Sequence, residues 1–165
     1  MILKPNVLEA LNTQLNAEIA STYLYLSMAA HFESRNFRGM AHWMQTQARE
    51  EWSHAMKIFG YIHERGGHVA LKQIDAPKSQ WGSVLEVFQD SLSHECAVSE
   101  RIHGLVRLAI NESDFATQSF LQWFINEQVE EEAQASLIVE KLKMMGDGNI
   151  GLFILDGELG KRAAE

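Results

Sequence analysis

The sequence lacks the residues that mark several common classes of protein. A single cysteine, Cys96, among 165 residues excludes an internal disulfide and any iron or zinc site made of four cysteines from one chain. No run of about 18 apolar residues is present to cross a membrane, and the start, Met1 to Pro5, has no apolar run typical of a signal peptide. We therefore expect a cytoplasmic protein with no membrane partner.

Positive charge is scarce as well. The chain has 14 lysines and arginines against 22 aspartates and glutamates, which gives a formal net charge of −8. Proteins that bind nucleic acid need clustered positive charge to neutralise phosphates, and the sequence has no basic run or arm. Nucleic acid is therefore not expected as a partner.

The periodicity of the apolar residues predicts an all-helical chain. Apolar residues recur in alternating steps of three and four, which is the spacing of one helix face, and proline is limited to Pro5 and Pro77. We expect four long helices, from Pro5 to about Ser34, from after Asn36 to about Arg65, from Ser83 to about Asn111 and from Asp114 to Met145, with a short fifth helix from Ile150 to Leu159.

Turn and capping residues fix the ends of these helices. Gly66–Gly67 is expected to stop the second helix, and Gly146–Asp147–Gly148 the fourth. Ser83 and Glu86 form a predicted capping box, in which Ser83 accepts from the Glu86 amide and the Glu86 side chain reaches back to Ser83. Each long helix thus has a recognisable boundary.

The connections predict how the helices are arranged. Two short turns make antiparallel hairpins of the first and second helices and of the third and fourth. The connection between the second and third helices holds about 17 residues and would span roughly 56 Å when extended, so it can run the length of a bundle. We expect one domain, 1–165, with a four-helix bundle at 1–145 and a short fifth helix and tail at 146–165.

Glu51 and His54 are a candidate pair of metal ligands. They lie three residues apart, which places both side chains on one helix face and close enough to share a metal ion. A single pair of this kind arises easily by chance on a solvated surface. Whether this pair binds a metal therefore depends on where the other carboxylates lie.

Each of the four apolar stripes carries a glutamate at about the same height. Glu18 lies about 17 residues before the first hairpin turn and Glu51 about 16 after it, while Glu95 and Glu131 are placed about 17 before and 19 after the second turn. Two such charges 5 Å apart repel by about 3 kcal/mol even at an effective dielectric of 20. Two divalent cations would neutralise the four carboxylates, with His54 as a nitrogen ligand.

This ligand set of oxygens and one imidazole suits iron or manganese and tolerates zinc. An alternative interpretation is a buried carboxylate–histidine network that only sets the register of the bundle, with no metal and no catalysis. The coincidence of level on four helices favours the metal site.

Three segments resemble the non-haem ferritins of bacteria and archaea. They are Asn16–Ser21 (NAEIAS), Glu50–Met56 (EEWSHAM) and Phe120–Glu132 (FLQWFINEQVEEE). The resemblance extends over essentially the whole chain and implies a ferritin-like fold. It also implies a homo-oligomeric shell of twenty-four subunits, which oxidises Fe(II) with O2 or hydrogen peroxide at a di-iron ferroxidase centre and stores a ferric oxyhydroxide mineral.

The resemblance also implies roles for individual residues. Glu18, Glu51 and His54 match the ligands of the first iron, with Glu51 bridging to a second. The remaining residues of the two-iron centre match Glu95 and Glu131, with Gln128 beside them and Tyr25 nearby as a further catalytic residue. A third, outer iron site matches Glu50, Glu127 and Glu130.

The sequence differs from related families at positions that bear on haem binding. Haem-containing bacterioferritins carry a haem-ligating methionine after the bridging glutamate, where this chain has Trp52, and a second E-x-x-H motif, where it has Gln128–Glu131. Haem binding is therefore not expected. A di-iron oxidase or peroxidase without mineral storage is the remaining catalytic alternative, and assembly into a hollow shell would separate the two functions.

Overall fold

The computed structural model describes residues 2–146 and 148–163, and these residues form five helices and no strand. The predicted all-helical fold is confirmed. Asp147, in the predicted stop after the fourth helix, lies outside the described residues. The helices are α1 (Pro5–Ser34), α2 (Arg38–Glu64), α3 (Val84–Asn111), α4 (Phe115–Met145) and α5 (Asn149–Leu159).

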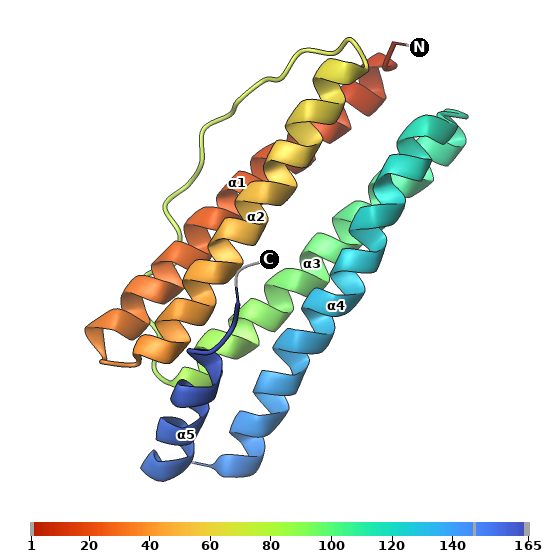
Figure 1. The fold of residues 1–165 in the computed structure, drawn as a ribbon. Helices are drawn as coiled ribbons and strands as arrows, with labels where there is room; N and C mark the ends of the chain where they lie inside the picture. Colours follow the sequence, from red (N-terminus) through yellow and green to blue (C-terminus); the bar gives the residue numbers. More distant parts are fainter. Residues whose placement is uncertain (1, 147, 164–165) are drawn as a thin grey trace.

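The four long helices form two antiparallel hairpins, α1 with α2 and α3 with α4 (Figure 1). The connection between α2 and α3 returns along the length of the bundle, so α2 and α3 run in the same direction. The predicted long crossover is therefore present. The short α5 packs against the start of α2 and the end of α4.

The helix ends follow the predicted signals with one difference. Gly66 has a φ of 67°, and the N–H of Gly67 donates to the Ile62 carbonyl at 2.8 Å, which closes α2. The Ser83 hydroxyl accepts from the Glu86 amide at 3.1 Å, as expected. The Glu86 carboxylate, however, accepts from the N–H of Gly82 at 2.7 Å, and its other oxygen accepts from Lys78 of the connection at 2.8 Å.

Two asparagines of α1 hold the long connection against the bundle. The Asn12 amide donates to the His68 carbonyl at 3.0 Å and accepts from the Ala70 N–H at 2.8 Å. One turn later the Asn16 amide donates to the Ala70 carbonyl at 2.8 Å and accepts from the Lys72 N–H at 2.7 Å. These side chains replace the backbone partners that an irregular segment lacks.

The buried apolar residues form two clusters at opposite ends of the bundle, and a polar layer separates them. On α1, for example, Leu15 belongs to one cluster and Tyr25 to the other, with Glu18 between them. None of the described helices is apolar enough over a sufficient length to cross a membrane. The fold thus places charged side chains at mid-height, away from both turns.

Candidate metal centre

Four glutamates, one from each long helix, make up the polar layer. Glu18, Glu51 and Glu95 are each 1% exposed, and Glu131 is 4% exposed. Each lies on the apolar stripe of an amphipathic helix, so packing of the stripes carries the carboxylates into the core. Buried carboxylates are rare unless they are paired or bind a metal.

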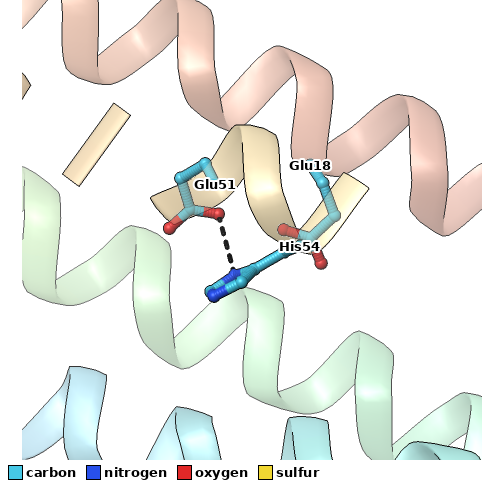
Figure 2. A group of neighbouring side chains, drawn as sticks. All are labelled: Glu18, Glu51 and His54. Carbon is cyan, nitrogen blue, oxygen red and sulfur yellow. Dashed lines mark ion pairs between the residues drawn. The ribbon is translucent and has the colours of Figure 1, made fainter. Parts of the chain in front are cut away.

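The first group of ligand atoms comes from α1 and α2. Glu18, Glu51 and His54 each offer one atom, and these atoms all lie within 4.8 Å of one another (Figure 2). One carboxylate oxygen of Glu51 is 3.7 Å from Nδ1 of His54. Gln14 donates to Oε1 of Glu18 at 2.7 Å, whereas Oε2 of Glu18 is buried, accepts from no backbone, amide or hydroxyl donor among the described residues, and lies beside the Glu51 carboxyl.

A second group shares His54 and reaches across to α4. His54, Glu127 and Glu131 offer atoms that also lie within 4.8 Å of one another. Nε2 of His54 is 3.8 Å from Oε1 of Glu127, so the two ring nitrogens face carboxylates on opposite sides. Trp123 and Phe124 meet the imidazole edge-on, with ring centroids 5.3 and 6.1 Å away.

Glu95 belongs to neither group. The buried hydroxyl of Tyr25 donates to Oε1 of Glu95 and lies 3.1 Å from the Ser91 hydroxyl. The Gln128 amide donates to Oε2 of Glu95 at 3.2 Å. Two neutral donors therefore hold Glu95 in place, and Tyr25 and Gln128 both contact a predicted ligand.

Two glutamines that the sequence interpretation gave no role also hold the carboxylates. Gln14 precedes Glu18 by four residues, and Gln47 precedes Glu51 by four, so each pair meets on one helix face. The Gln47 amide donates to Glu51 at 3.2 Å and to Glu131 of α4 at 2.7 Å. Gln47 thus links the two hairpins at the metal centre.

Burial raises the pKa of all four glutamates. It is the largest cause in each case, and for three of them a neighbouring carboxylate is the next, as Glu51 is for Glu18. The pKa of Glu131 rises to about 8. Within the described part of the chain, none of the four forms an ion pair with lysine or arginine. Each of these carboxyls is therefore easier to protonate than a free glutamate, and a bound cation would favour its deprotonated form.

The three residues of the expected outer site line one cavity beside the metal centre. Glu50, Glu127 and Glu130 border a cavity of about 410 Å3 together with Glu131 and Arg162. Glu127 is half-buried and shares the second ligand group, whereas Glu130 is exposed. Glu50 contacts Arg162 at 2.5 Å, so its carboxylate is partly neutralised by the protein itself.

Comparison with known proteins agrees with this geometry. The family model of the ferritin-like domain matches residues 8–145. A bacterial non-heme ferritin from Staphylococcus aureus (strain MRSA252) is 42% identical over 161 residues, which are 98% of this chain and 97% of the relative. The chain belongs to the non-haem ferritins. A second bacterial non-heme ferritin, from Bacteroides fragilis (strain 638R), is 47% identical over 93% of this chain and 95% of its own length.

Solved ferritin structures have the same fold. The open-pore ferritin of the hyperthermophilic archaeon Archaeoglobus fulgidus superposes with a TM-score of 0.97 at 50% identity, over 98% of this chain and 99% of that chain. An engineered closed form of the same archaeal ferritin also gives a TM-score of 0.97, at 49% identity over 99% of both chains. The predicted four-helix bundle with a fifth helix is therefore a ferritin fold, and iron storage is the general function that family membership supports.

Proposed function

We propose that this ferritin oxidises Fe(II) at a two-metal centre made by Glu18, Glu51, His54, Glu95 and Glu131, with Tyr25 and Gln128 in contact with Glu95. The product is stored as a ferric oxyhydroxide mineral inside a homo-oligomeric shell, which we expect to hold twenty-four subunits. Iron is here the substrate and cargo. Glu50, Glu127 and Glu130 are the proposed outer site for a third ion.

One observation carries this proposal. Oε2 of Glu18 is buried, accepts from no backbone, amide or hydroxyl donor of the described residues, and belongs to a group with the neighbouring Glu51 carboxyl and with His54. Leaving a buried acceptor unsatisfied costs about 1–3 kcal/mol, and more when the group is charged. In the metal-free centre a proton shared with Glu51 can satisfy this atom, and a metal ion would take the place of that proton.

The chemistry follows from the donor set. Two Fe(II) ions held side by side supply the two electrons that reduce O2, with two protons, to hydrogen peroxide, so superoxide need not be released. Hydrogen peroxide can accept two further electrons and two protons to give water. Hard carboxylate oxygens stabilise Fe(III) relative to Fe(II), which favours the oxidation. Each Fe(III) then hydrolyses with two waters to FeOOH and three protons.

Replacement of two proposed ligands tests the site. Glu51→Ala and His54→Ala should each abolish rapid Fe(II) oxidation, because each removes a donor atom from the centre, while the assembled shell stays intact. The initial rate is followed by the near-ultraviolet absorbance of ferric products. His103→Ala, which changes an exposed histidine of α3, is the matched control. Wild-type rates in both ligand variants would refute the site.

Storage is tested separately by particle size and capacity. Light scattering on the metal-free protein should show a particle of about twenty-four chains, which takes up many more irons than two per subunit. A monomer or dimer that stops at two irons per chain would instead identify a di-iron oxidase or peroxidase. A protein that binds no metal would leave only the structural bundle.

A further inference from the structure

The segment after α5 returns to the middle of the bundle. The helix α5 is anchored on the start of α2, where Asp156 accepts from the backbone N–H of Met40 at 2.9 Å and Leu155 and Leu159 are buried. Residues 160–163 then turn back toward mid-height, beside the metal centre (Figure 1). Residues 160–163 are thus brought to the level of the glutamate layer.

Arg162 is fixed in this segment by four contacts. Its guanidinium lies over the Trp43 ring, 4.5 Å from the centroid. One guanidinium nitrogen donates to Oε1 of Gln47 at 2.9 Å, and another donates to Glu50 at 2.5 Å. Nε2 of His42 donates to the Arg162 backbone carbonyl at 2.9 Å, which holds the backbone as well.

The contact with Gln47 determines which way that amide faces. Arginine only donates, so the atom of Gln47 that it contacts must be the carbonyl oxygen. The NH2 group is then directed at the carboxylates of Glu51 and Glu131, at 3.2 and 2.7 Å. Without Arg162, the oxygen end of the amide would lose its donor, and Gln47 would be held only through its NH2 group by the two carboxylates.

We propose that Arg162 is a positioning residue of the metal centre, which acts through Gln47 to set the orientation of Glu51 and Glu131. This role rests on the proposed function of these glutamates as metal ligands. The planar fork of arginine suits it, since one group contacts Gln47 and Glu50 at once while stacking on Trp43. Residues that orient ligands in this way typically change metal affinity by 10–100-fold when replaced.

The sign of the effect distinguishes positioning from simple charge. Removing a positive charge beside a cation site favours cation binding, because it removes a repulsion. Losing the orientation of Gln47 weakens binding instead. A weaker site after removal of Arg162 therefore cannot be a charge effect.

The experiment measures anaerobic Co(II) binding to the metal-free protein, because Co(II) reports both affinity and ligand geometry through its visible absorption. Arg162→Met removes both hydrogen bonds but retains an apolar contact with Trp43. Lys161→Met removes the same charge from the neighbouring position, which is exposed and lines the same cavity, and is the matched control. Gln47→Met and the Gln47→Met/Arg162→Met double variant complete a double-mutant cycle, which measures the coupling between Arg162 and Gln47.

Arg162→Met should weaken Co(II) binding by about tenfold and alter the visible spectrum, while Lys161→Met should leave the spectrum unchanged and bind Co(II) as tightly as wild type or more tightly. Gln47→Met should reproduce the altered spectrum with Arg162 present, and adding Arg162→Met to it should change nothing further. Light scattering checks that each variant assembles. If Arg162→Met does not assemble, the spectrum of Gln47→Met still tests the proposal.

Three results would overturn the proposal: Co(II) binding in Arg162→Met as tight as wild type or tighter with an unchanged spectrum, an equal loss in Lys161→Met, or additive losses in the double variant. Wild-type protein that binds no Co(II) would instead refute the proposed function. The two failures are therefore distinguishable.

Discussion

Glu131→Gln tests whether the centre holds protons before it holds metal. Burial, followed by the charge of Glu95, raises the pKa of Glu131 from an ordinary 4.5 to about 8. A group with a raised pKa in the folded state contributes stability that is complete below about pH 4.5 and is lost as the pH rises through about 8. The metal-free wild type should therefore be less stable at pH 9 than at pH 6.

The magnitude follows from the same values. Between pH 6 and pH 9 the loss runs only from pH 6 to the folded-state pKa of about 8, and at about 1.4 kcal/mol for each pH unit this gives an upper figure of about 3 kcal/mol. For a domain of this size, 1 kcal/mol shifts the melting temperature by about 2–4 °C. Glutamine removes the titration and can still accept from Gln47, so the fall in melting temperature between pH 6 and pH 9 should shrink by at most about 6–12 °C.

The assay is thermal unfolding of the chelator-treated protein at both pH values. Glu140→Gln, which changes an exposed glutamate of the same helix, is the control and should behave as wild type. Saturating Zn(II) should reverse the trend in the wild type, since a metal binds the deprotonated carboxylates. Equal pH dependence in Glu131→Gln and wild type would refute the assignment of a proton to this site.

Three further predictions concern other features of the fold. Zn(II) binding near pH 7 should release protons from the metal-free centre, so the calorimetric heat of binding should depend on the ionisation enthalpy of the buffer. A heat that is the same in all buffers would contradict the presence of protonated carboxyls. Gly39→Ala should detach α5, because a Cβ there would lie 1.7 Å from the Asp156 carbonyl oxygen, and rapid proteolysis after Met145 should report it. Asn12→Ala should lower the free energy of unfolding by about 1–3 kcal/mol. It should also speed hydrogen exchange of the Ala70 amide, because Asn12 accepts a hydrogen bond from that N–H.

The bundle and the ligand layer were predictable because both depend on helical periodicity. The stripes of α1 to α4 fix which residues face inward, and counting from the turns fixes their height, so Glu18, Glu51, Glu95 and Glu131 are all buried in the core. Their roles in iron oxidation remain predictions. The supporting glutamines were also readable, because Gln14 and Gln47 each precede a glutamate by one helical turn.

Other contacts had no periodic signal. Arg162 follows the last helix, so only the path of the folded chain brings it to Glu50 and Gln47. The contacts of Asn12 and Asn16 with the connection could not be predicted, since this irregular segment has no period of its own. Contacts of this kind depend on tertiary structure and not on local pattern.

The two ligand groups differ in how they depend on the separation of the hairpins. The group of Glu18, Glu51 and His54 lies within the α1–α2 hairpin, whereas the group of His54, Glu127 and Glu131 needs α4 as well. A thermal fluctuation that moves the hairpins apart would leave the first group whole and dismantle the second. An ion bound by the second group would therefore hold the two hairpins together, and it would be released when the hairpins move apart.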